Sequence, residues 1–317
     1  MQHLRRHLLG GLIGLALTVP SLAHATPEQL RIGYQKGSLA LVVLKESTHL
    51  EQRLKGTKIT WVEFPAGPPL LEALAVGSID VGSTGDSPPV FAQAAGKDLI
   101  YIAYESPAPE GSAIVVPKDS PIRALADLKG KRIAFTKGSS AHFLTVQALK
   151  KAGLTLADIT PVYLQPAEAR AAFEGGNVDA WSIWDPYYAA IEQSNKARVL
   201  TTSKGLSPNN SFYLASAGLT RESPDTVKAL LEEINKTSIS SQRPHETSQL
   251  ITRLLGLEPA VVERFVARRP GSPVLPLTPK VIAEQQAVAD TFFQAKLIPK
   301  PIKVADVIWR NNSQSKN

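Results

Sequence analysis

The sequence predicts an α/β protein of two similar lobes, each a mixed, mainly parallel sheet flanked by helices, with a ligand cleft between the lobes. The first evidence is a pair of repeats. The octapeptide "RIGYQKGS" at 31–38 returns as "RIAFTKGS" at 132–139, and "GSIDVGSTGDSPP" at 77–89 aligns without gaps with "GNVDAWSIWDPYY" at 176–188. Both motifs keep their order and almost their spacing, so the chain is predicted to contain one structural unit twice.

Each unit alternates short apolar strands with helical patterns. Strands are expected over Leu30–Tyr34, Ile59–Phe64 and Ile79–Gly82 in the first unit, and over Arg132–Phe135, Thr160–Leu164 and Val178–Ser182 in the second. A helix is expected after each Lys-Gly-Ser turn, over 39–54 and 141–153, and another before each third strand. Such alternation favours parallel sheets covered on both faces, which bind ligands at the carboxyl ends of their strands.

Two further strands, at 112–117 and 210–218, bracket the second unit and are expected to be the crossings between the lobes. From about Leu219 the apolar spacing is helical, so the C-terminal part should return to pack on the first lobe. The predicted division is a signal segment at 1–25, a discontinuous first lobe at 26–111 and 216–317, and a second lobe at 112–215 with hinge strands at its ends.

The first 25 residues have the order of an export signal. Arg5 and Arg6 precede an apolar run at 8–19, and Ala23-His24-Ala25 matches an A-x-A cleavage site. The apolar run is too short to span a bilayer. We therefore expect cleavage near Ala25 and a soluble protein of the periplasm, since the chain has no Cys to which a lipid could be attached.

The composition argues against several classes of function. The formal charge of +7 falls to +5 when Arg5 and Arg6 are removed, and no long run of Lys or Arg exists, so no nucleic-acid partner is expected. The chain has no Cys, and His49, His142 and His245 show no metal-ligand spacing. Phosphate-loop, nucleophile-elbow and dinucleotide motifs are also missing from the sequence. We expect no catalytic residue, no metal and no cofactor.

Each Lys-Gly-Ser turn leads from a strand into a helix, where an anion is favoured. The first N–H groups of a helix have no partner within it, and the helix dipole favours negative charge there. Because both turns should face one cleft, Ser139 and Ser140 are expected to contact the ligand, while Ser38 mainly caps its helix. Gln35 can donate a hydrogen bond to a ligand oxygen, and Thr84-Gly85 offers a hydroxyl and an unobstructed N–H.

Other polar and aromatic residues have two interpretations each. Asp86 and Asp185 precede Pro-containing helix starts and are expected to cap those helices, although a free carboxylate there could bind an amine. One of Trp181 and Trp184 should belong to the core, and Trp184, nearer the strand end, is the candidate for contact with a ligand tail. His142 is either a packing residue or part of the cleft rim.

Five stretches closely resemble the periplasmic aliphatic-sulfonate-binding proteins of ABC importers: "RIGYQKGS", "WVEFPAGPPLLEALAVGSIDVGSTGDSPP", "FAQAAG", "KGSSAHFL" and "NVDAWSIWDPYY". The resemblance implies a two-lobed binding protein of type II-like fold. It also implies that the protein, as a monomer, delivers alkanesulfonates to an inner-membrane ABC permease with its ATPase subunit, for use as a sulfur source. Carried over by matching motif, the ligand-binding residues are Gln35, Thr84, Gly85, Asp86, Ser139, Ser140, His142 and Trp184.

Two alternatives stay open at this point. One is a binding protein of the same fold for taurine, nitrate or a vitamin precursor. Trp184 and the few charged groups speak against nitrate, and an amine ligand would need Asp86 or Asp185 free of capping. The other is an enzyme of this fold that makes a thiamin precursor, against which the scarcity of His and the absence of Cys speak.

Overall fold

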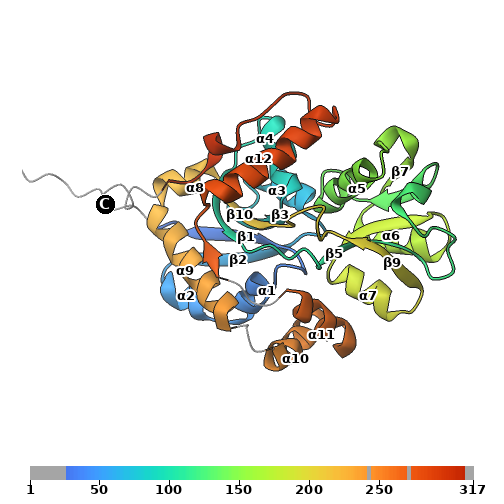
Figure 1. The fold of residues 1–317 in the computed structure, drawn as a ribbon. Helices are drawn as coiled ribbons and strands as arrows, with labels where there is room; N and C mark the ends of the chain where they lie inside the picture. Colours follow the sequence, from blue (N-terminus) through green and yellow to red (C-terminus); the bar gives the residue numbers. More distant parts are fainter. Residues whose placement is uncertain (1–25, 241–243, 270–272, 311–317) are drawn as a thin grey trace, which may run out of the picture.

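Two sheets lie side by side in the computed structural model and form two lobes, which confirms the predicted fold class (Figure 1). The structure describes residues 26–240, 244–269 and 273–310, so the predicted export signal at 1–25 lies outside the described residues. Among the described residues, no helix combines the length and the apolar character that a membrane span requires.

The first sheet has six strands in the order β11-β4-β10-β3-β1-β2. Their bounds are β1 Gln29–Tyr34, β2 Lys58–Glu63, β3 Val81–Gly85, β4 Ile100–Glu105, β10 Ser211–Ala215 and β11 Val274–Leu275. β1 pairs in parallel with β2 and β3, whereas β10 runs antiparallel between β3 and β4. Strands β1 to β4 therefore point the same way, and β1 and β3 end at the same edge of the sheet.

The second sheet repeats this arrangement with five strands in the order β7-β6-β8-β5-β9. Their bounds are β5 Ser112–Pro117, β6 Arg132–Phe135, β7 Thr160–Tyr163, β8 Ala180–Trp184 and β9 Ala197–Thr202. β6 pairs in parallel with β7 and β8, and β5 runs antiparallel between β8 and β9. The antiparallel strand of each sheet, β10 or β5, is the first strand after the chain has crossed from the other lobe.

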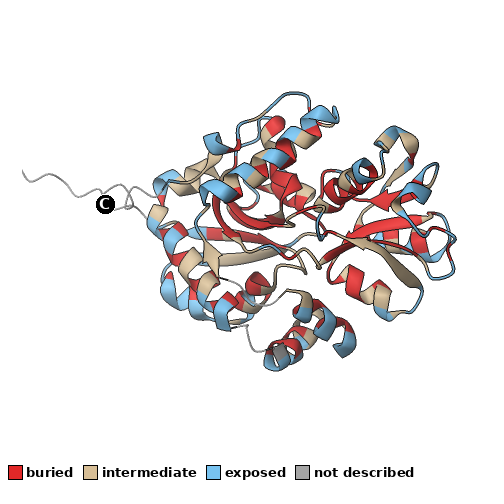
Figure 2. Cartoon of the chain, in the orientation of Figure 1, coloured by how far each residue is buried: buried red, intermediate tan, exposed pale blue. Residues whose placement is uncertain are grey.

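Helices cover both faces of both sheets, and their buried faces meet the strands (Figure 2). The helices around the first sheet are α1 Leu39–Glu46, α2 His49–Arg53, α3 Gly67–Ala75, α4 Ser87–Ala94, α8 Ala217–Glu222, α9 Pro224–Ser240, α10 Pro244–Leu255, α11 Pro259–Arg268 and α12 Pro279–Gln294. Those of the second are α5 Ser140–Lys151, α6 Pro166–Glu174 and α7 Tyr187–Gln193, and short 3-10 turns span Leu125–Leu128, Leu156–Asp158 and Val304–Val307. Burial of these apolar faces is the main stabilising contribution.

The repeated Arg and Asp residues have the same structural role in both lobes. In the first lobe the guanidinium of Arg31 pairs with Asp80 at 2.6 Å, and the Arg31 N–H donates to the same carboxylate at 2.7 Å. In the second lobe Arg132 pairs with Asp179 at 3.0 Å, and its N–H donates at 2.8 Å. Each pair ties the first strand of a unit to the residues that lead into its third strand. The repeat therefore preserves a strand-to-strand contact as well as a turn.

Local details differ from the prediction. The single helix expected over 39–54 is two helices, because Ser47 takes an extended backbone conformation and its hydroxyl donates to the Leu44 carbonyl at 2.9 Å. Strands β3 and β8 begin two residues later than expected. The predicted division into lobes stays a prediction. The second sheet takes its strands from 112–202, and β10, at the end of the predicted second lobe, pairs in the first sheet.

Candidate functional site

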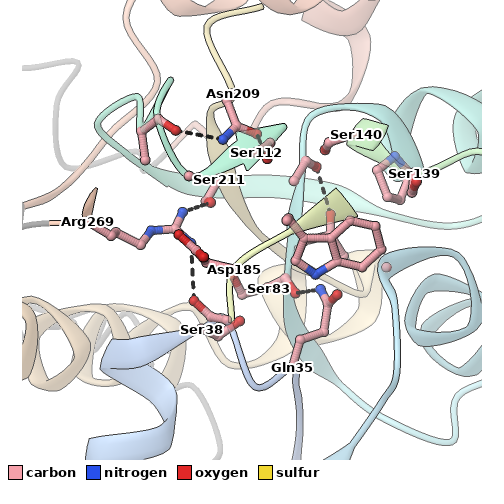
Figure 3. Close-up of a pocket in the computed structure, with 18 of the residues that line it drawn as sticks. Gln35, Ser38, Ser83, Ser112, Ser139, Ser140, Asp185, Asn209, Ser211 and Arg269 are labelled. Carbon is pink, nitrogen blue, oxygen red and sulfur yellow. Dashed lines mark hydrogen bonds between the residues drawn. The ribbon is translucent and has the colours of Figure 1, made fainter. Parts of the chain in front are cut away.

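A pocket lies between the two sheets, where the ends of β1 and β3 face the end of β8 and the start of α5 (Figure 3). The two segments that connect the lobes, before β5 and before β10, line it as well, and α11 contributes its C-terminal end. These are the strand ends and helix starts at which parallel α/β sheets bind ligands. The pocket therefore occupies the cleft that the repeats predict.

The start of α5 offers a free hydrogen-bond donor to this pocket. Ser139 is the N-cap residue and Ser140 the first helical residue, and both line the pocket. Among the described residues, no hydrogen bond to the N–H groups of Ser140 or Ala141 is found. The hydroxyl of Ser139 donates to the Thr136 carbonyl at 2.7 Å and accepts no capping hydrogen bond from the helix. The donor left for a ligand in the pocket wall is thus the Ser140 N–H, because Ala141 is fully buried outside the lining and the Ser140 hydroxyl is engaged by the Asp86 carboxylate.

Gln35, Thr84 and Gly85 lie on the first-lobe side of the same pocket. The Gln35 amide donates to the Ser83 carbonyl at 3.0 Å, which holds the side chain across the strand ends. A Cβ at Gly85 would lie 2.2 Å from the Ser140 hydroxyl oxygen, so a larger residue there would force that hydroxyl to turn away. The two lobes are therefore in close contact on this side of the pocket.

The two Asp residues that correspond in the repeat have different surroundings. Asp86 is 1% exposed, does not line the pocket and makes no capping hydrogen bond, which differs from the expected helix cap. Its carboxylate accepts from the hydroxyls of Ser87 at 2.8 Å and Ser207 at 3.2 Å. Burial raises the pKa of Asp86, while hydroxyls, that of Ser140 foremost, act in the opposite direction. Hydroxyl donors thus replace the helix N–H groups as its partners.

Asp185 does cap its helix. One carboxylate oxygen accepts from the Ala189 N–H, in the first turn of α7, at 2.9 Å. The same oxygen lies 3.3 Å from a guanidinium nitrogen of Arg268. Burial raises the pKa of Asp185 to about 7, although the positive charge of Arg268 opposes this shift. Asp185 lines the pocket on the side of Arg269, away from Ser139 and Ser140 (Figure 3).

The aromatic candidates separate into one pocket residue and two buried ones. Trp184 lines the pocket, whereas Trp181 is fully buried in the core of the second lobe. His142 is also fully buried and does not line the pocket. Its Nδ1 accepts from the Gly138 N–H at 3.2 Å, and its ring stacks on Phe135 with centroids 5.0 Å apart. Burial lowers the pKa of His142 to about 4, and Lys137 contributes in the same direction.

The structure thus brings together six of the eight proposed ligand-binding residues: Gln35, Thr84, Gly85, Ser139, Ser140 and Trp184. Asp86 and His142 are buried and lie outside the pocket lining. Among the described residues, no group of three His, Cys, Asp or Glu side chains is placed to hold a metal ion.

Arg269 is the pocket residue that sequence reasoning missed. It follows α11 and enters the pocket from the side opposite Ser139 and Ser140 (Figure 3). Its guanidinium donates to the Gly37 carbonyl at 3.1 Å and to the Ser211 hydroxyl, and Glu105 lies 3.9 Å away. The available signal was the Arg-Arg pair at 268–269, in a part of the chain whose apolar spacing is helical. That signal does not reveal that the helix ends at the pocket, since α11 belongs to a segment expected only to pack on the first lobe.

Comparison with known proteins places the chain in one group. The family model described as "ABC transporter, phosphonate, periplasmic substrate-binding protein" matches residues 47–261. An aliphatic sulfonates-binding protein of Escherichia coli strain K12 is 45% identical over 98% of this chain and 97% of its own length.

Solved structures agree with this grouping. The alkanesulfonate-binding protein SsuA from Xanthomonas axonopodis pv. citri, bound to MOPS, superposes with a TM-score of 0.88 at 50% identity and covers 90% of this chain and 100% of its own. The periplasmic aliphatic sulphonate binding protein SsuA from Escherichia coli gives a TM-score of 0.82 at 46% identity and covers 90% of this chain and 93% of its own.

Proposed function

Because the chain belongs to the family of periplasmic aliphatic-sulfonate-binding proteins of ABC transporters, we propose that it captures alkanesulfonates in the pocket between its lobes and delivers them to a membrane permease. Like its relatives, it is a binding protein and not an enzyme. The permease and its ATPase subunit are the expected partners. We propose further that residues 1–25 direct export and are removed near Ala25, which leaves a monomer in the periplasm.

The observation that supports this proposal best is the free N–H group at the start of α5. A sulfonate is fully ionised near neutral pH, so it accepts hydrogen bonds and has no proton to donate. The Ser140 N–H, which lies in the pocket wall at a helix N-terminus and has no partner among the described residues, matches that requirement. A monoprotonated phosphonate would also need an acceptor beside its head group. Asp86 is buried outside the lining and accepts from serine hydroxyls, and Asp185 lines the pocket on the side away from Ser140 (Figure 3). The site therefore favours a sulfonate over a phosphonate.

The rest of the pocket suits a short organic tail. Trp184, Pro88, Ala108 and Phe265 are the apolar side chains in its lining, and they come from both lobes, from a connecting segment and from α11. Contact with them would stabilise the ligand in proportion to the apolar area that is buried. An inorganic anion such as sulfate or nitrate has no group to make these contacts.

Calorimetric titration tests the proposal. The protein without residues 1–25 would be titrated with ethanesulfonate, ethylphosphonate, sulfate and nitrate at neutral pH. We expect ethanesulfonate to bind tightest, and ethylphosphonate to bind about tenfold more weakly because its proton lacks an acceptor. Tightest binding to sulfate, nitrate or the phosphonate would overturn the assignment.

A further inference from the structure

The end of α11 carries two adjacent arginines that contact opposite lobes. Arg268 contacts Asp185, which follows β8, and Glu192 of α7 in the second lobe. Arg269 contacts Gly37 after β1, Glu105 of β4 and Ser211 of β10 in the first. The α10–α11 hairpin, whose helices lie below both sheets in Figure 1, therefore joins the lobes in addition to the two connecting segments and to the packing of α5 against α4 and α12.

Arg268 is held firmly by the second lobe. Its guanidinium pairs with Asp185 at 3.3 Å and with Glu192, and it lies 3.8 Å from the centroid of the Tyr188 ring. The side chain is only 14% exposed, so these interactions are weakly screened by solvent. Apolar contacts reinforce the attachment, because Val261 and Phe265 of α11 pack with Ala189 of α7 in one buried cluster.

Arg269 contacts the first lobe and also faces the pocket. Its donors reach the Gly37 carbonyl at 3.1 Å and the Ser211 hydroxyl. A guanidinium has more N–H donors than these contacts use, so donors remain for a ligand. Glu105, at 3.9 Å, is itself engaged by the Tyr213 hydroxyl. Arg269 is therefore a positive group in a pocket whose other lining donors are hydroxyls, amides and backbone N–H groups.

We propose that Arg269 is a ligand-binding residue that attracts the sulfonate's negative charge, and that Arg268 is the positioning residue that holds Arg269 in place by attaching α11 to the second lobe. The inference rests on the proposed function in naming a sulfonate as the anion. That the ligand is negatively charged follows from the positive charge of Arg269 alone. It predicts that ligand binding and attachment of the hairpin are coupled, since one peptide unit links the two arginines.

The direct test is titration of Arg269 variants with ethanesulfonate at low and high salt. Arg269→Met should lower the affinity by about tenfold, because the attraction between the guanidinium charge and the anion is lost. It should also weaken the dependence of the affinity on salt, which a change in packing alone would not do. Arg269→Lys should lie between Met and the wild type. Arg221→Met is the matched control, because that side chain is 71% exposed on α8 and pairs only with Glu222.

A double-mutant cycle tests the role of Arg268. If Arg268 acts through Arg269, Arg268→Met should weaken binding on its own and add little in the Arg269→Met background. Circular dichroism and melting temperature would establish that each variant is folded. Binding of Arg269→Met that equals the Arg221→Met control would overturn the proposal, and fully additive losses would overturn the positioning role. If the wild type prefers another anion, the proposed function fails, and titration of the same variants with that anion still tests the arginine pair.

Discussion

Single residues of the same type have different roles in the two lobes. Asp86 and Asp185 occupy equivalent positions in the repeat, yet Asp86 accepts from serine hydroxyls while Asp185 caps α7 and pairs with Arg268. The sequence identifies both as helix-start residues because capping is a local property. It does not distinguish their partners, since Ser207 and Arg268 are far away along the chain.

His142 should make the stability of the fold depend on pH. Its pKa is lowered to about 4, mainly by burial, so the unfolded chain takes up the proton first as the pH falls. The stability that His142 contributes is fully present above about pH 6.5 and is lost as the pH falls toward 4. Between about pH 7 and pH 4.5 this loss should amount to roughly 2 kcal/mol.

Urea unfolding at both pH values measures this contribution. His142→Asn keeps an acceptor for the Gly138 N–H but cannot titrate, so its stability should fall by about 2 kcal/mol less than that of the wild type over this range. Equal losses in the two proteins would exclude His142 as the source of the pH dependence.

Trp184 should affect long ligands more than short ones. Its side chain lines the pocket, and contact with an alkyl tail scales with the apolar area that is buried. Trp184→Ala should therefore lower the affinity for hexanesulfonate more than that for methanesulfonate, measured by calorimetry. A uniform loss across tail lengths would place the tail elsewhere.

At the level of elements, the local patterns predicted the three parallel strands of each repeated unit, β5, β10 and the two turns, but missed β4, β9 and β11. The Lys-Gly-Ser turns lead into α1 and α5 as expected, because strand, turn and helix signals are all local. The break between α1 and α2 was missed, since a helical apolar spacing continues through Ser47. The antiparallel position of β5 and of β10 within their sheets depends on contacts between distant segments, and so does the position of Arg269. No local pattern reveals such contacts.

The two neighbouring serines at the start of α5 are expected to have different roles. The Ser139 hydroxyl is engaged by the Thr136 carbonyl, whereas Ser140 lies against Gly85 of the other lobe. Ser140→Ala should weaken sulfonate binding by about tenfold or more, because the buried Asp86 carboxylate loses a hydroxyl donor next to the pocket. Ser139→Ala should mainly lower the melting temperature. A larger loss of affinity for the Ser139 variant than for the Ser140 variant would contradict this assignment.

At the scale of the whole molecule, binding depends on how closely the lobes approach each other. Gly37 of the first lobe is a contact point, because a Cβ there would lie 2.9 Å from the Asp185 carbonyl oxygen of the second. That oxygen belongs to the backbone and cannot rotate away. A ligand can favour the closed arrangement only by its higher affinity for it over an open one.

Gly37→Ala should hold the lobes apart and weaken binding without unfolding either lobe. We expect small-angle scattering with saturating ethanesulfonate to show a larger radius of gyration than for the wild type, together with a loss of affinity. Gly218→Ala is the control, because a Cβ at that helical position meets no atom closer than 4.0 Å. A Gly37 variant that closes and binds like this control would show that close approach at Gly37 is not needed.

The central claim is that a sulfonate lies between the lobes with its head group at the start of α5. A crystal structure grown with 2-bromoethanesulfonate tests it most directly, because anomalous scattering locates the bromine and the density locates the sulfonate. We predict the sulfonate within hydrogen-bond distance of the Ser140 N–H and the bromine beside the apolar lining that includes Trp184. A sulfonate that contacts one lobe only, or lies outside this pocket, would contradict the account.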